Sequence, residues 1–203
     1  MNRLLQELTM LNGIPANEKQ VRTYFRNAAE GLGSVRYDNL GSIVVEKIGD
    51  ASGPRIMVAG HMDEIGFLVS EITKEGYLRF IPAGGWWGHV VLSQQFLVTT
   101  KDGKTLLGVV GSKPPHILSP EEKAKVVDLK EMYLDIGVAS KEEAESQGIR
   151  IGDMITPWIE SRPLANPKYL LAKAFDNRIG IALAIEVLQN LQKATHPNRF
   201  FAV

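Results

Sequence analysis

The spacing of apolar residues changes twice along this 203-residue chain, and this change restricts the fold more than any other feature. Near the amino terminus, apolar residues recur every three or four positions, which is typical of amphipathic helices. From Gly66 onward, short apolar stretches are joined by Lys-Glu-Gly and Lys-Asp-Gly turns, which is typical of β-hairpins. After the proline-bounded segment 163–167, apolar residues again recur at the spacing of a helix. We therefore expect an α/β domain that is interrupted by a β-rich insertion.

The first domain is predicted to be a layered sheet-and-helix domain formed by both ends of the chain, residues 1–66 and 167–203. Its pattern predicts two helices at the start, the second opened by a capping pair of Asn17 and Gln20. The run 56–59 is apolar at every position, which favours a central strand that is buried on both faces. Residues 169–174 predict another short strand, and residues 178–193 predict a mostly apolar helix.

Residues 67–166 are predicted to form the barrel-like insertion, with hairpin strands and two short helices. Ser119 and Ser140 each begin a capping box for one of these helices. Trp86, Trp87 and His89 lie together beside glycines, and paired exposed aromatic residues are typical of interface anchors. We therefore expect the insertion to mediate contacts between copies of the chain.

Composition excludes several classes of protein. Lys plus Arg and Asp plus Glu both number 23, so the chain lacks the positive charge of a nucleic-acid-binding protein. The absence of cysteine excludes disulfides, thiolate zinc sites and a cysteine nucleophile, so a metal would need His, Asp or Glu ligands. Glu7 interrupts any signal-peptide core, and no run approaches the ~18 apolar residues of a membrane span. We expect a cytoplasmic protein with no nucleic-acid or membrane partner.

Polar residues follow directly on the predicted strand 56–59. His61 would emerge at the carboxyl end of this strand, where open α/β sheets place their sites. His61 and Asp63 are two positions apart and can face the same side, so that the imidazole binds a metal and the carboxylate orients the ring. Glu64 would point elsewhere. The alternative is a histidine that is only hydrogen-bonded at a strand end, with Asp63 capping the turn.

Asp176 has a similar position, between the predicted strand 169–174 and the helix that follows. It could serve only as a helix N-cap, which is a common role for Asp. A carboxylate can also bridge two cations, as a two-metal hydrolase requires. The other histidines are weaker candidates, because His89 and His116 lie in the insertion and His196 precedes a proline in a polar turn. Motifs of serine hydrolases, phosphate-binding loops and dinucleotide-binding folds are absent from the sequence.

Three stretches together resemble the motifs of metallopeptidase family forty-two, the glutamyl and deblocking aminopeptidases. They are VAGHMDEIGF at 58–67, GVVGSKPPH at 108–116 and AFDNRIG at 174–180. The resemblance covers essentially the whole chain. It implies a dinuclear metal site in the α/β domain, and an insertion that drives dimerisation and assembly into hollow tetrahedral dodecamers.

By position, the resemblance makes His61 the first imidazole ligand, Asp176 the bridging carboxylate and Asp63 the acid that holds the His61 ring. Asn177 and Arg178 match the motif and are assigned no catalytic role. In the family, the strand at 200–203 leads into a Glu-Glu pair, of which the first is the general base and the second a metal ligand. A further carboxylate and a histidine ligand come later.

The apolar run 199–203 is not followed by a turn, so we expect that a longer natural protein continues beyond Val203. The leading hypothesis is the amino-terminal part of a metal-dependent aminopeptidase. Its intact form would act on peptide amino termini through water made acidic by two divalent ions, zinc, cobalt or manganese. This chain alone is expected to be inactive, because it lacks the general base and most of the ligands.

Two other functions remain open. A glucanase-type glycoside hydrolase would need two carboxyl groups ~5–5.5 Å apart, whereas Asp63 and Glu64 are adjacent in an extended segment and point apart. The chain could instead be a non-catalytic assembly or folding module.

Overall fold

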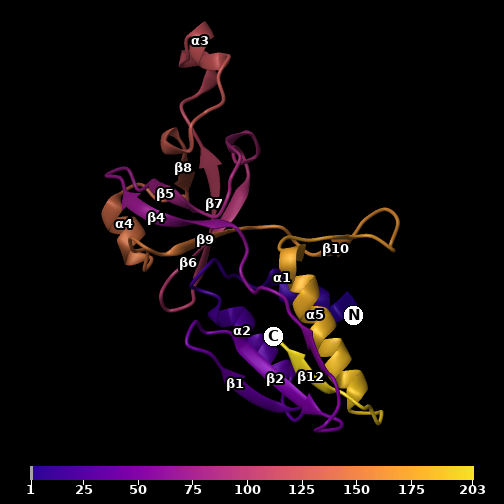
Figure 1. Ribbon diagram of the computed structural model, residues 1–203. Helices are drawn as coiled ribbons and strands as arrows, with labels where there is room; N and C mark the ends of the chain where they lie inside the picture. Colours follow the sequence, from indigo (N-terminus) through magenta and orange to yellow (C-terminus); the bar gives the residue numbers. More distant parts are fainter. Residues whose placement is uncertain (1) are drawn as a thin grey trace. The chain divides into compact units, whose positions relative to one another are not determined.

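The computed structural model describes residues 2–203, which divide into two compact units (Figure 1). The sheet unit comprises the residues up to Glu64 together with Glu160–Val203, and the barrel unit comprises Ile65–Ile159. The expected fold class, an α/β sheet domain with a barrel-like insertion, is confirmed. None of the helices within residues 2–203 has the length and apolar character needed to cross a membrane.

The sheet unit is built on four strands in the order β1-β2-β12-β3. β12 is antiparallel to β2 and parallel to β3. Three helices, α1, α2 and α5, share one apolar core with the sheet, and α5 runs beside β12 (Figure 1). The elements are α1 Asn2–Met10, α2 Lys19–Ala28, β1 Ser34–Tyr37, β2 Ile43–Ile48, β3 Arg55–Val58, α5 Phe175–Leu191 and β12 Arg199–Ala202.

Three predictions for this unit are wrong in detail. The capping pair is absent, because α2 begins after Glu18 and the Gln20 side chain instead accepts a hydrogen bond from the Asn12 backbone N–H at 3.1 Å. β3 is the edge strand and not a buried central one, so Ile56 and Met57 are 44% and 66% exposed. The expected strand 169–174 shrinks to β11 Leu170–Leu171, which pairs only with β10 Arg162–Pro163.

The barrel unit is a closed antiparallel barrel with the strand order β4-β5-β8-β7-β6-β9. The capping box at Ser119 is present at the start of α3, and the Ser140 hydroxyl accepts a bond from Glu143 N at the start of α4. α3 lies at the tip of the long excursion between β7 and β8 (Figure 1). The elements are β4 Gly66–Ile72, β5 Leu78–Ala83, η1 Gly88–Val90, β6 Gln95–Thr99, β7 Thr105–Gly111, η2 Pro115–Ile117, α3 Pro120–Lys123, η3 Leu129–Glu131, β8 Tyr133–Asp135, α4 Lys141–Ser146 and β9 Met154–Pro157.

Aromatic rings fill the core of the barrel around Phe67. The Phe67 ring centroid lies 4.6 Å from that of Phe80, 4.7 Å from that of Trp86 and 5.5 Å from that of Phe96. Trp86 also donates its indole N–H to the Gly66 carbonyl at 2.8 Å. The expectation of an exposed Trp86–Trp87 pair is therefore wrong for Trp86, whose ring packs into this core, whereas Trp87 is 66% exposed.

Two glycines allow the end of β3 to approach the first turn of α5. A methyl group on Gly180 would lie 2.4 Å from Asn177 Oδ1 and 3.1 Å from Gly60 Cα. One on Gly60 would lie 2.8 Å from Ile181 N. A Cβ on Gly60 would therefore clash with the backbone of α5, whereas one on Gly180 would clash with Asn177 Oδ1 and press closely on Gly60.

We predict that Phe67→Ala destabilises the barrel unit by about 3–5 kcal/mol, because it removes a ring at the centre of a close-packed core. All three tryptophans, Trp86, Trp87 and Trp158, belong to this unit, so denaturant unfolding followed by tryptophan fluorescence reports on it specifically. Ile151→Ala is the control, since Ile151 is 70% exposed and its loss should cost less than about 0.5 kcal/mol. Equal effects of the two variants would contradict the packing described here.

We also predict that Gly180→Ala destabilises the sheet unit by about 1–3 kcal/mol, because the added methyl group clashes with Asn177 Oδ1 and overpacks the contact with Gly60. The sign is informative, since Gly→Ala inside a helix normally stabilises by about 0.5–1 kcal/mol. Denaturant unfolding followed by far-ultraviolet circular dichroism measures the change. Gly85→Ala, where the methyl group meets no atom within 4 Å, should have little effect. A more stable Gly180→Ala chain would show that the two segments are not in close contact.

Candidate metal site

His61 lies between two carboxylates within the sheet unit. Its Nδ1 is 2.9 Å from Asp63 Oδ1, and its Nε2 is 3.0 Å from Asp176 Oδ1. The three residues come from two segments that are far apart in the sequence, the loop after β3 and the first turn of α5. The structure thus brings together the three residues that the sequence singled out for a metal site.

Asp176 does not cap α5. The helix begins after Ala174, which has a left-handed φ of 57°, and no side chain caps it. Asp176 and Asn177 have non-helical backbone angles, and Asn177 Oδ1 accepts a hydrogen bond from Gly180 N at 3.0 Å. The Asp176 side chain, which is 94% exposed, is therefore free to point toward His61.

The electrostatic surroundings of His61 favour positive charge. Partial burial lowers the pKa of the imidazole, whereas hydrogen bonds and charge attraction from Asp176 and Asp63 raise it, and the net result is a raised pKa. Two anionic groups therefore direct their oxygens at one half-exposed ring, and a cation of higher charge would be stabilised by the same surroundings.

Glu64 points away from this site, as the alternation along an extended segment predicted. Its side chain is 4% exposed, and its Oε1 lies 2.6 Å from Lys173 Nζ and 3.3 Å from Arg178 Nη2. Burial raises the pKa of Glu64 and lowers that of Lys173, while their mutual attraction opposes both shifts. Lys173 was not predicted from the sequence as a functional residue, and Arg178 was assigned no role. The signal that could have revealed them is a lone cation within each of two apolar stretches, 170–175 and 178–185.

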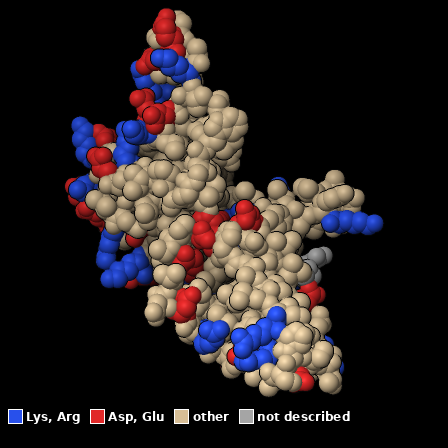
Figure 2. All heavy atoms as spheres, in the orientation of Figure 1, with Lys and Arg blue, Asp and Glu red and all other residues tan. Residues whose placement is uncertain are grey.

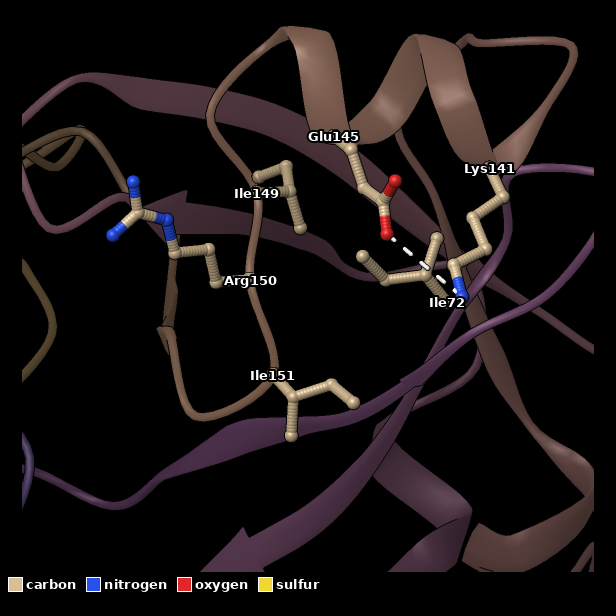
Figure 3. A pocket seen from close by; sticks show the side chains of 6 residues that line it. All are labelled: Ile72, Lys141, Glu145, Ile149, Arg150 and Ile151. Atoms are coloured by element: carbon tan, nitrogen blue, oxygen red, sulfur yellow. Dashed lines mark ion pairs between the residues drawn. The ribbon is translucent and has the colours of Figure 1, made fainter.

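A surface cavity of about 240 Å³ adjoins the site within the sheet unit. It is lined by residues 60–63, by Ile181 and by Val203 among others. The barrel unit has another cavity, of about 380 Å³, but its lining includes no histidine and its Lys141 and Glu145 face each other at 3.8 Å (Figure 3). Only the first of these two cavities lies beside the residues singled out for chemistry.

The donor set at His61 and Asp176 fits a divalent metal ion. Imidazole nitrogen and carboxylate oxygen are suitable ligands for zinc, cobalt or manganese. Asp63 faces the other ring nitrogen, which is the usual arrangement of a carboxylate that orients a ligating histidine. Within residues 2–203, no group of three or more His, Asp or Glu side chains is placed to hold a metal ion.

Residues 41–203 match the family described as M42 glutamyl aminopeptidase. The glutamyl aminopeptidase of Lactococcus lactis subsp. cremoris (strain MG1363) is 37% identical over 190 residues, which are 92% of this chain and 54% of that protein. The matches to curated relatives such as this one cover most of the chain. The chain itself spans only about half the length of those relatives.

Solved structures share the fold. A TET aminopeptidase from the marine sediment archaeon Thaumarchaeota archaeon SCGC AB-539-E09 has a TM-score of 0.92 and 40% identity, over 98% of this chain and 57% of that one. A Pyrococcus horikoshii TET1 peptidase, described as assembling into a tetrahedron or a large octahedral shell, has a TM-score of 0.84 and 28% identity, over 98% and 59%. A structure described as an endoglucanase from Thermotoga maritima has a TM-score of 0.79 and 30% identity, over 98% and 58%.

The match to the family model covers most of the chain, and it includes the loop that carries His61 and Asp63 as well as the turn that carries Asp176. The family is a metallopeptidase family, which agrees with the donor chemistry at these residues. The chain belongs to the M42 glutamyl aminopeptidase family.

Proposed function

We propose that this chain, which spans about half the length of its curated relatives, is part of a longer metal-dependent aminopeptidase that removes residues from the amino termini of peptides. The observation that carries the proposal is the His61 ring held between Asp63 and Asp176. In this proposal His61 and Asp176 would hold divalent metal ions, and Asp63 is a positioning residue. Family membership supports the class of reaction.

Each of the three side chains has a distinct task in this proposal. Asp63 accepts the N–H of His61 Nδ1, which fixes the tautomer in which Nε2 carries a lone pair. In the metal-free chain, Nε2 shares a hydrogen bond with Asp176 Oδ1 at 3.0 Å. With a metal ion bound, this lone pair and an Asp176 oxygen would instead both be directed at the ion. The Asp176 carboxylate has two oxygens and is largely exposed, so it can take more than one partner. When bound, divalent ions polarise the scissile carbonyl and lower the pKa of a bound water.

The surroundings of Glu64 argue against a glycoside hydrolase. Such an enzyme needs two carboxyl groups that both reach the sugar. Here Asp63 is engaged with His61, and the buried Glu64 is engaged with Lys173 and Arg178. Neither carboxylate is available as a partner of the other, so the likeness to a structure described as an endoglucanase supports a shared fold only.

We predict that the 203-residue chain alone hydrolyses leucine and glutamate chromogenic amides at no measurable rate, because two ligands are too few to hold two cations. The longer protein should hydrolyse them in a chelator-sensitive way. In that protein, Asp176→Ala should abolish turnover, and Asp63→Asn should lower metal affinity by about 10–100-fold. Elemental analysis and steady-state kinetics provide the two measurements.

His116→Ala in the longer protein is the control, because His116 is exposed in the barrel unit and belongs to neither segment of the site. Robust, chelator-sensitive turnover by the short chain would show that other residues complete the site. A longer protein without metal or turnover would instead favour a non-catalytic assembly module.

We further propose that the barrel unit mediates self-association. On β7, Leu107 and Val109 are 48% and 44% exposed, although outward positions of such a strand are normally polar. Uncharged residues cover a large part of the barrel-unit surface visible in Figure 2. The assembly described for the Pyrococcus horikoshii relative supports a role in building oligomers.

Sedimentation velocity should therefore detect dimers or larger species of this chain. Leu107→Lys should weaken the association at least about tenfold, because it places a charge in an apolar contact. Thr105→Lys is the matched control, since Thr105 lies on the same exposed face of β7 but is already polar. A chain that sediments only as a monomer at high concentration would count against the proposal.

A further inference from the structure

A group of buried charges lies directly behind the candidate metal site. Arg178 is fully buried, with an exposed fraction of 0%, and Lys173 and Glu64 are 5% exposed. Arginine is almost never fully buried unless its N–H groups are all engaged, because desolvation of its charge is costly. Its presence two residues after Asp176 therefore calls for a specific task.

The Arg178 guanidinium binds two separate segments, the loop after β3 and the end of α1. Its Nε donates to the Met62 carbonyl at 3.1 Å, and its Nη2 donates to Glu64 Oε1 at 3.3 Å. Its Nη1 donates to the carbonyls of Leu8, at 2.8 Å, and Leu11 at the end of α1. These carbonyls at a helix C-terminus need donors and favour a positive charge.

The contact with Met62 is the informative one. Met62 is the residue between His61 and Asp63, so its carbonyl belongs to the backbone from which both side chains project. Arg178 itself follows Asp176 by two residues. The same guanidinium thus joins the backbone of the histidine loop to the turn that carries the Asp176 carboxylate.

We propose that Arg178 is a positioning residue that sets the separation of His61 and Asp176, a role that rests on the proposed metal site. The backbone at Asp176 and Asn177 is non-helical, so the position of Asp176 depends on the contacts of the residues beside it, among them Asn177 and Arg178. Arginine suits this task because its planar fork presents five N–H groups in fixed directions, whereas a lysine ammonium is a compact point charge.

Lys173 provides an internal comparison. Its ammonium is buried beside the same Glu64 and donates to Leu11 O and Asn12 Oδ1, both at 3.1 Å. It has no hydrogen bond to residues 61–63 among the bonds described. If both cations only stabilised the fold, replacing either one should affect the His61 site to the same extent. A positioning role predicts that replacing Arg178 affects this site and replacing Lys173 does not.

The test compares Arg178→Lys with Lys173→Met in the metal-free 203-residue chain. The readout is the nitrogen spectrum of the His61 ring by NMR at one fixed pH, together with the unfolding midpoint. The chain has four histidines, so His61→Gln assigns the signals. Asp176→Ala supplies the reference spectrum of a ring that has lost its contact.

We expect Arg178→Lys to move the His61 signals most of the way to the Asp176→Ala reference, and Lys173→Met to leave them in place while lowering the midpoint. Equal movement in both variants, or no movement in a folded Arg178→Lys chain, would overturn the proposal. So would an Arg178→Lys chain that fails to fold beside a folded Lys173→Met chain, since Arg178 would then be structural.

The proposed function fails on a different measurement. It fails if the longer protein shows no chelator-sensitive aminopeptidase activity, whereas the spectra described here contain no metal and no substrate. The two results can therefore be separated.

Discussion

The need to satisfy one buried guanidinium links the parts of the sheet unit. Arg178 has no access to water, so each of its N–H groups must find an oxygen within the protein. Those oxygens come from the end of α1 and from Met62 and Glu64 in the loop after β3, while Arg178 itself belongs to α5. The interaction thus joins three segments that are distant in sequence: the end of α1, the loop after β3 and the start of α5. The accessible side chains of His61 and Asp176 project from the last two of these segments.

The candidate site has accessible side chains on a backbone that is held in place by buried contacts. Its functional side chains are half-buried or exposed, but the backbone beneath them is held by Arg178 and by the contact of Gly60 with Gly180. Such a division is common where a site must hold its geometry and remain accessible to a ligand. Neither feature needs the barrel unit, because every residue involved belongs to the sheet unit.

Local signals in the sequence identified much of this structure. The Ser119 capping box and the spacing of His61 and Asp63 each depend on residues within a few positions, and both are as expected. The failures concern partners that are distant in sequence. Gln20 satisfies the end of α1 in place of its own helix, and the apolar strand 55–58 lies at an edge. The ion group of Glu64, Lys173 and Arg178 could not be inferred because Glu64 is more than a hundred residues from both cations.

The topology of the sheet has a consequence for the order of folding during synthesis. β12 lies between β2 and β3, yet the ribosome makes it only after the entire barrel unit. The barrel closes only once β9 is made, because β9 pairs with both β4 and β6, but all its strands precede β12 in the chain, so it can close before the sheet receives its central strand. Until β12 arrives, β2 and β3 have no common neighbour, and their apolar residues depend on chaperones or on the early helices for cover. The inserted unit is thus expected to reach its native form before the unit that surrounds it in the sequence.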